Sequence, residues 1–79
     1  MKLEKLPALS GKEVIKILSK IGFEPKRQKG SHIILIKPEG SPRKIVVVPM
    51  HKEIDRGTLI EIIRQAGLTK EQFLDLVSR

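Results

Sequence analysis

The chain has 79 residues, enough for one domain with a single hydrophobic core, and a chain of this size buries only about 60% of the surface that its unfolded state exposes. It has no cysteine, which excludes disulfide bonds and thiolate metal sites. No apolar run approaches the roughly 20 residues that cross a bilayer, and the first residues lack the apolar core of a signal peptide, so we expect a soluble cytoplasmic protein.

Positive charge is concentrated in the first two thirds of the chain. Residues 1–51 have eleven Lys or Arg and four Glu, which gives +7, whereas residues 52–79 have five residues of each sign. A one-sided basic surface attracts the phosphate backbone of nucleic acids, although such charge can also do no more than keep a small protein in solution. The chain has two Phe and no Trp or Tyr, which argues against binding single strands by stacking bases on aromatic side chains.

An extended arm and an amphipathic helix are predicted for the first part of the chain. A proline keeps residues 3–9 out of a helix, and Ser10 and Glu13 have the spacing of a capping box at a helix start. The helix runs to about Ile21, and Gly22 ends it because glycine readily adopts a left-handed backbone. The apolar positions of this helix follow the spacing of one buried stripe. They are Val14, Ile15, Leu18 and Ile21.

A three-stranded antiparallel meander is predicted for the middle of the chain. Residues 23–28 are mostly polar and contain a proline, which is typical of a weak edge strand. A turn with glycine then leads into an apolar strand, His32–Lys37. The loop at 38–42 is rich in turn-forming residues and leads into a third strand, Arg43–Val48. Pro49 ends that strand.

Two further helices are predicted for the C-terminal part. Either Asp55 or Thr58 caps the first of them, and Gly67 ends it. Its buried stripe is the clearest in the chain and consists of Leu59, Ile62, Ile63 and Ala66. Thr69 and Gln72 have capping-box spacing at the start of a short last helix. The apolar residues of this last helix are Phe73, Leu76 and Val77.

These elements predict an α+β fold of two layers in the order α-β-β-β-α, with a short C-terminal helix, as one domain over residues 1–79. Ile33–Ile36 and Ile45–Val48 are apolar on both faces, whereas a sheet with one solvated face alternates. A partner protein or a second copy in a homodimer would cover the second face. The alternative is that the last helix or the N-terminal arm folds over it.

The turn Lys29-Gly30-Ser31-His32 is the main candidate for chemistry, because it fixes an imidazole where a loop meets a sheet. An imidazole can take a proton from a ribose 2′-hydroxyl and return one to a leaving oxygen, so RNA cleavage without metal needs little beyond a positioned base, an acid and cations. Gly30 and Ser31 can present backbone N–H groups to a phosphate. The cations expected around His32 precede it in the chain, end its strand or start the strand predicted to pair with it. They are Lys26, Arg27, Lys29, Lys37, Arg43 and Lys44.

Less specific interpretations of both histidines stay open at this point. A single histidine at the start of a strand is often a surface residue, and His51 either serves the same site as an accessory group or ties down its loop by a hydrogen bond. The sequence has no His-x-His or His-x-x-x-His pair, and His51 with Glu53 and Asp55 lacks the spacing of a known metal site. We therefore expect neither a metal ion nor another cofactor.

A series of motifs, in order along nearly the whole chain, resembles the HicA toxin family. The first of them are Leu6-Pro7, Ser10-Gly11-Lys12-Glu13 and Gly22-Phe23. The strands contribute Gly30-Ser31-His32 and Val48-Pro49-Met50-His51. The C-terminal part contributes Glu53-Ile54, Gly57-Thr58-Leu59 and Gln65-Ala66-Gly67-Leu68.

This resemblance implies a small ribonuclease of a type II toxin-antitoxin pair, with a fold similar to the double-stranded RNA-binding domain. It also implies that mRNA cleavage depends on His32, and that a HicB antitoxin neutralises the toxin by covering this site. The helix predicted after residue 54 starts with Asp55-Arg56-Gly57-Thr58 and lacks the lysine cluster that double-stranded RNA-binding domains have there. Single-stranded or locally opened mRNA is therefore the favoured substrate.

We predict from these observations a metal-independent endoribonuclease. His32 acts as general acid or base, Lys29 and nearby cations hold the phosphate, and Ser31 positions the substrate. Two other classes of function stay open. One is a non-catalytic RNA-binding module in which His32 only supports its turn, and the other is a partner-binding domain whose charge is incidental.

Overall fold

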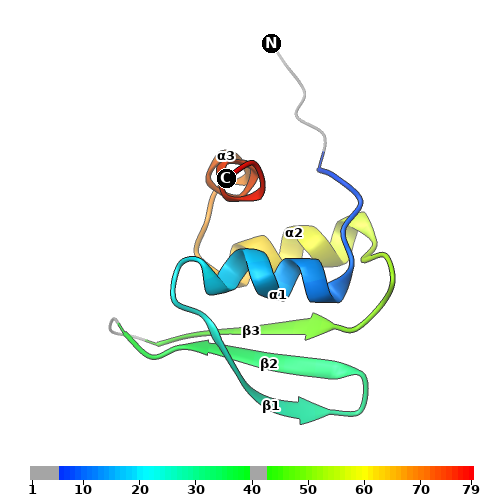
Figure 1. The fold of residues 1–79 in the computed structure, drawn as a ribbon, viewed down its shortest axis with the longest axis vertical. Coiled ribbons are helices and arrows are strands. Elements are labelled where there is room, and N and C mark those ends of the chain that lie inside the picture. Colours follow the sequence, from blue (N-terminus) through cyan, green and yellow to red (C-terminus); the bar gives the residue numbers. More distant parts are fainter. Residues whose placement is uncertain (1–5, 40–42) are drawn as a thin grey trace.

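Helices cover one face of a three-stranded antiparallel sheet in the computed structural model, which describes residues 6–39 and 43–79 (Figure 1). The strands have the order β1-β2-β3, so each strand pairs with the next one in the chain. This arrangement confirms the predicted α-β-β-β-α fold with a C-terminal helix. The elements are α1 (Gly11–Ser19), β1 (Glu24–Lys29), β2 (His32–Lys37), β3 (Lys44–Pro49), α2 (Arg56–Gln65) and α3 (Lys70–Val77).

The predicted capping box starts α1. The Ser10 hydroxyl accepts a hydrogen bond from the Glu13 N–H at 3.1 Å, and the Glu13 carboxylate accepts one from the Ser10 N–H at 2.8 Å. The helix ends at Ser19, earlier than the predicted end at Ile21, because the next N–H groups bond to carbonyls three residues back. Gly22 has a φ of 99° and follows this last turn, as predicted.

A two-residue turn, Gly30-Ser31, joins β1 to β2. Lys29 pairs with His32 across the turn, and Gly30 has a φ of 58°. Ser31 has no positive φ, and a positive φ at the first of two turn residues alone is typical of a type II′ turn, whose twist matches that of the flanking strands. β2 has the predicted bounds, whereas β1 and β3 are each shifted by one residue, and Pro49 is the last residue of β3.

β2 and β3 have one buried face and one open face. Leu35, Val46 and Val48 are fully buried in the core beneath α1 and α2. The other face, called the outer face below, carries the alternate residues of both strands, which are Ile34, Ile36, Ile45 and Val47. On it, Ile45 is 50% exposed and Val47 is 36% exposed. The prediction that these strands are apolar on both faces is therefore confirmed.

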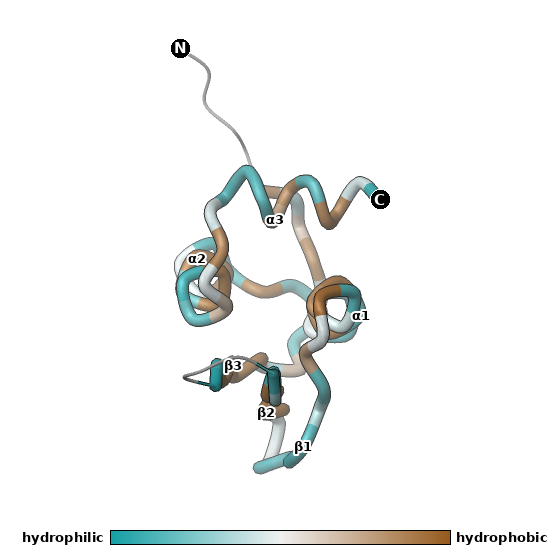
Figure 2. The backbone as a smooth tube through the Cα atoms, turned by 90° about the vertical axis from the view of Figure 1, so that its left-hand side faces the viewer, coloured by the Kyte–Doolittle hydropathy of each residue, from teal (hydrophilic) through white to brown (hydrophobic). Residues whose placement is uncertain are grey.

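α3 forms a third level, on the side of α1 and α2 that is turned away from the sheet (Figure 2). It buries Phe73 and Leu76, and the Lys20 ammonium donates hydrogen bonds to the carbonyls of Leu76 and Arg79 at 3.0 and 3.2 Å. The alternative that the last helix folds over the outer face is therefore wrong. Ile17 is also buried although it lay outside the predicted stripe, and it lines a hollow together with Leu9 and Val77 of α3.

The described part of the N-terminal arm also lies on the helix side of the sheet. Leu9 is buried in the core, and its carbonyl accepts a hydrogen bond from the Ile54 N–H at 2.8 Å. Leu6 packs against the same core. Residues 3–5 of the predicted arm and 40–42 of the predicted loop lie outside the described residues. Within 6–39 and 43–79, no element covers the outer face.

Side-chain caps start the two C-terminal helices. The Asp55 carboxylate accepts hydrogen bonds from the Thr58 N–H at 3.1 Å and from the Thr58 hydroxyl at 2.7 Å, so Asp55 is the cap of α2. The predicted capping box of Thr69 and Gln72 starts α3. The predicted stripe of the second helix is buried as expected, and it consists of Leu59, Ile62, Ile63 and Ala66.

The start of α1 packs against the end of β3 with almost no space between them. A Cβ atom on Gly11 would lie 2.3 Å from the Pro49 carbonyl oxygen and 3.0 Å from the Met50 Cα. The Gly11 N–H donates to the His51 carbonyl at 2.9 Å, and the Met50 N–H donates to the Ser31 carbonyl at 2.7 Å. These contacts connect α1, the end of β3 and the β1–β2 turn.

Replacing Gly11 with alanine should destabilise the protein by about 2 kcal/mol, because the new Cβ meets main-chain atoms that cannot rotate away. Gly57→Ala is the matched control, since its Cβ would have the flexible Asp55 carboxylate as its nearest neighbour, at 3.4 Å. Urea unfolding of the wild type and both variants measures the difference. If Gly11→Ala is no less stable than Gly57→Ala, the packing argument fails.

The cap of α2 makes a pH-dependent contribution to stability. Hydrogen bonds from the Thr58 side chain and main chain hold the pKa of the Asp55 carboxyl below its usual 3.8. Because the folded pKa is the lower one, this contribution is complete above the unfolded pKa and is lost as the pH falls through the folded pKa.

Asp55→Ala should therefore melt at a lower temperature than the wild type at pH ~7, and the gap should shrink toward pH ~2. Asp55→Asn keeps a capping acceptor without a titrating group. It should therefore melt at a higher temperature than Asp55→Ala at low pH as well. Thermal melts of the three proteins across this range test the prediction. A difference in melting temperature between the wild type and Asp55→Ala that does not change with pH would contradict the prediction.

Candidate functional site

His32, the first residue of β2, lies on the outer face of the sheet. Side chains alternate along a strand, so His32 points to the same side as Ile34 and Ile36 and away from the side of the buried Leu35. The side chain of His32 is exposed. The imidazole therefore has a fixed backbone position at the end of a strand together with access to solvent, as the sequence predicted.

β1 places two cations beside β2 on the same face. Lys29 pairs with His32 and Arg27 pairs with Ile34, and residues directly opposite in an antiparallel ladder point to the same side. Both basic side chains are exposed. The register of the β1–β2 hairpin thus brings the Lys29 side chain next to the His32 imidazole.

The turn before His32 is anchored through its carbonyl groups. The Gln28 side-chain amide donates a hydrogen bond to the Gly30 carbonyl at 3.1 Å, and the Met50 N–H donates one to the Ser31 carbonyl. Neither bond uses the N–H groups of the turn, which are the groups expected to meet a phosphate. The turn is held from β1 on one side and from the end of β3 on the other.

Lys37 and Lys44 lie on the helix side of the sheet, away from His32. The two residues pair with each other at the opposite end of β2 and β3. The Lys37 ammonium lies 6.0 Å from the centre of the Phe23 ring, and a Cβ on Gly67 would lie 2.5 Å from the Lys44 Cε. The structure therefore does not bring these two lysines together with the other predicted cations.

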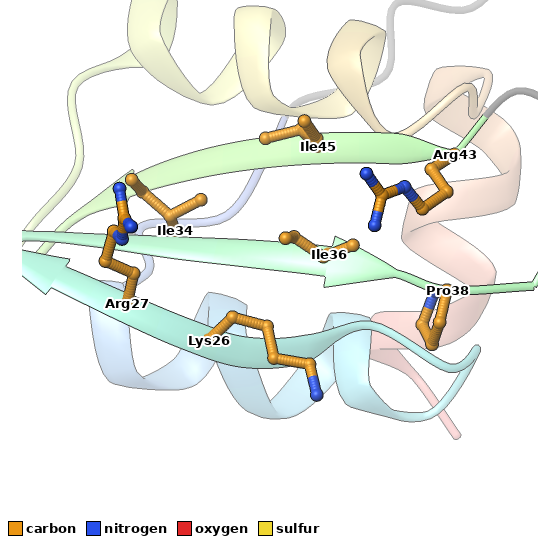
Figure 3. A pocket seen from close by; sticks show the side chains of 7 residues that line it. All are labelled: Lys26, Arg27, Ile34, Ile36, Pro38, Arg43 and Ile45. Atoms are coloured by element: carbon orange, nitrogen blue, oxygen red, sulfur yellow. The ribbon is translucent and has the colours of Figure 1, made fainter.

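A hollow of about 650 Å³ lies on the outer face toward that same end of the sheet (Figure 3). Its floor is aliphatic, and Arg27 and Arg43 extend their guanidinium groups on two sides of it. Lys26, where the register of β1 shifts, forms an ion pair with Glu24 at 3.0 Å. The hollow is lined by Lys26, Arg27, Ile34, Ile36, Pro38, Arg43 and Ile45.

His51 lies in the loop between β3 and α2, beside the start of α1. Its main-chain carbonyl accepts the hydrogen bond from Gly11, so its backbone ties this loop to α1. Its side chain is exposed and lines a separate hollow of about 270 Å³ that His32 does not line. Lys12 and Lys52 also line this hollow and add positive charge that the sequence reasoning missed. In the sequence, Lys12 lies within the family motif Ser10-Gly11-Lys12-Glu13, and Lys52 directly follows the motif that ends at His51.

The described part of the chain has neither a cluster of metal ligands nor a membrane-spanning helix. Within 6–39 and 43–79, no three His, Asp or Glu side chains come together as a set of metal ligands. No helix of this part of the chain is both long and apolar enough to cross a membrane. The charged and titratable groups on the outer face near β1 are an imidazole, ammonium and guanidinium groups, and the Glu24 carboxylate that pairs with Lys26.

The family is decided by comparison with known protein families. The family model described as HicA toxin of bacterial toxin-antitoxin matches residues 11–68, which is more than half of the chain. The chain belongs to the HicA toxin family. The match starts at the first residue of α1 and ends just after α2, so it includes both histidines and leaves out α3. Comparison with curated proteins gives no match. This HicA protein is therefore the toxin of a toxin-antitoxin pair, which implies an antitoxin as its partner.

Proposed function

We propose that this HicA toxin is a metal-independent endoribonuclease that cleaves mRNA, and that His32 is its catalytic residue. The observation that carries the proposal is the position of His32 in a toxin of this family. It is an exposed imidazole at the start of β2, beside Lys29, on the sheet face that α1 and α2 leave open. The anchored turn before it supports the proposal, because proton transfer needs a group that is held in place.

The chemistry that fits these groups is attack of a ribose 2′-hydroxyl on the adjacent phosphodiester. The 2′-oxygen forms a bond to phosphorus as its proton moves to a base, and the bond between phosphorus and the 5′-oxygen breaks as an acid protonates that oxygen. Neutral imidazole accepts a proton and imidazolium donates one, so His32 fills one of these two roles. Lys29 stabilises the negative charge that develops on the phosphoryl oxygens, and Ser31 positions the substrate.

The cations of the outer face and the turn before β2 bind the RNA backbone in this proposal. We leave out Lys37 and Lys44, because their side chains lie on the helix side of the sheet. Arg56 is the only basic residue in the first turn of α2, so contacts that span a duplex groove are weak here, and single-stranded or locally opened mRNA is the proposed substrate. The proposed phosphate contacts are Lys26, Arg27, Lys29, Gly30, Ser31 and Arg43.

The proposed regulator is an antitoxin of the HicB type that inhibits by covering the His32 site. Its existence follows from the family, and its type and mode of inhibition are part of this proposal. An mRNA substrate places the toxin in the cytoplasm. A homodimer that uses the outer face is the alternative assembly.

His32→Ala should lower the rate of RNA cleavage by about 100-fold or more, because it removes the proton-transfer group. Cleavage by the wild type should continue in EDTA. His51→Ala should lower the rate by less than about tenfold, since His51 lines a hollow that His32 does not share. Single-turnover cleavage of labelled mRNA measures the rates of the two variants and of the wild type with and without EDTA.

Circular dichroism and thermal melts show whether the His32→Ala protein keeps its fold, which its exposed side chain predicts. Wild-type cleavage by this variant would refute the assignment. Salt-sensitive RNA binding without cleavage by the wild-type protein would favour a non-catalytic RNA-binding module.

RNA binding should depend on the cations of the outer face and not on those of the helix side. In the His32→Ala background, Arg27→Ala and Lys29→Ala should each weaken binding and reduce the slope of log K against log salt by about 0.7. Lys37→Ala is the control, since its ammonium lies against Phe23, and it should leave the slope unchanged. Fluorescence anisotropy with a single-stranded RNA at several salt concentrations measures this. Equal slopes for all three variants would count against the proposed RNA face.

A further inference from the structure

A hollow at one end of the sheet, called the end hollow below, carries positive charge that the proposed cleavage chemistry does not use. It has a volume of about 270 Å³ and is lined by Ser10, Lys12, Met50, His51 and Lys52. The start of α1 and the segment after β3 supply these residues, and Figure 1 shows both at the end of the molecule where the β1–β2 turn lies. Two ammonium groups and an imidazole thus share one small surface, and none of the five residues is acidic.

The lysines of the end hollow have no ion-pair partner within residues 6–39 and 43–79. No carboxylate of this part of the chain pairs with the Lys12 or Lys52 ammonium. The Glu13 carboxylate accepts the hydrogen bond from the Ser10 N–H, and Glu53 is exposed and does not line the hollow. The positive charge of the end hollow is therefore available to an anion from outside the chain.

Lys12 occupies a position that is unfavourable for its own helix. It is the second residue of α1, where the positive end of the helix dipole disfavours a cation. Two main-chain N–H groups of this helix start are already bonded, to the Ser10 hydroxyl and to the His51 carbonyl. The charge of the end hollow therefore comes from side chains. A residue that breaks a local rule without a gain in stability is expected at a functional surface.

Main-chain contacts hold the end hollow next to the turn before His32. The Met50 N–H donates a hydrogen bond to the Ser31 carbonyl at 2.7 Å. Pro49 pairs with His32 in the sheet and His51 is two residues further on, so the Cα atoms of the two histidines lie within about 13 Å of each other. An RNA strand whose scissile phosphate lies at His32 therefore brings a phosphate a few nucleotides away to the end hollow.

We propose that the end hollow binds a phosphate of the RNA strand other than the one that is cleaved. This inference deepens the proposed function and rests on it for the identity of the ligand. The Lys12 and Lys52 ammonium groups neutralise the phosphate, and the His51 imidazole donates a hydrogen bond to one of its oxygens. Binding of this remote phosphate fixes the strand relative to His32, so it orients the reacting bond and takes no part in proton transfer.

An acidic protein segment matches the end hollow less well than RNA does. Of the five lining residues only Met50 is apolar, and it is half-buried. Protein interfaces are built around an apolar core, whereas contacts between cations and phosphates are sufficient to hold a nucleic-acid backbone. The composition of the end hollow therefore favours a phosphate over a carboxylate of a partner protein.

The first test measures RNA affinity in the His32→Ala background at several salt concentrations. The double change Lys12→Ala and Lys52→Ala should reduce the slope of log K against log salt by about 0.7, the contribution of one phosphate contact in a single strand. Lys44→Ala with Lys70→Ala is the matched control, because it removes the same charge from two exposed lysines on the helix side and at the start of α3. Its slope should stay unchanged, and equal slopes for the two double variants would overturn the proposal.

Methylphosphonate substitution then locates the phosphate along the RNA. Each RNA carries one uncharged methylphosphonate, and one position a few nucleotides from the cleavage site should weaken binding to the His32→Ala toxin by about tenfold. In the double variant of Lys12 and Lys52 the same substitution should have no further effect, because the groups that bind this phosphate are already gone. A scan in which every position weakens both proteins alike would overturn the proposal.

Lysine footprinting uses the intact end hollow, so it decides the proposal even if the double variant does not fold. RNA should slow chemical acetylation of Lys12 and Lys52 in the His32→Ala toxin and leave that of Lys70 unchanged. Unchanged acetylation of Lys12 and Lys52 with RNA bound would contradict the proposal. Protection by the antitoxin and not by RNA would assign the end hollow to protein binding and overturn it as well. None of these measurements uses cleavage, so the end hollow and the catalytic assignment of His32 stand or fall separately.

Discussion

A helix start can approach a strand end as closely as α1 approaches β3 only where the residue between them has no side chain. Gly11 meets this condition, and the carbonyl oxygen of Pro49 occupies the space that a Cβ would need. The same segment then bonds to the β1–β2 turn through Met50 and Ser31. The backbone position of His32 therefore depends on packing between elements that are far from it in the sequence.

Alternation along β2 fixes which groups share the outer face. A slip of one residue in the register would turn His32 toward the core and Leu35 toward solvent. Burial of Leu35 with Val46 and Val48 opposes this slip, so the core keeps the imidazole outside. The same alternation puts the aliphatic outer-face residues of β2 and β3 on the face of the imidazole. The candidate site and the apolar patch are thus consequences of one register.

Local patterns predicted the elements of this fold because their causes are local. The caps at Ser10 and Thr69, the glycine turn and the bounds of β2 each depend on residues a few positions apart. Lys37 and Lys44 were predicted near His32 because one ends its strand and the other starts the paired strand, although strand alternation already places Lys37 on the opposite side. The burial of Ile17 was not predicted from its own segment, and in the structure it lines a hollow with Leu9 and Val77, which are distant from it in the chain. The functional assignment of His32 depended on the family motifs, because a histidine at a strand start has no distinctive local signal.

The position of α3 shows how a chain of 79 residues can enlarge its core and keep a site open. α3 adds two buried side chains, Phe73 and Leu76, and Lys20 binds carbonyls at its end. Had it covered the outer face, it would have buried the aliphatic side chains there but closed the approach to His32. By packing behind α1 and α2 it stabilises the fold from the other side. The exposed apolar surface of the outer face therefore follows from the same arrangement that keeps the imidazole accessible.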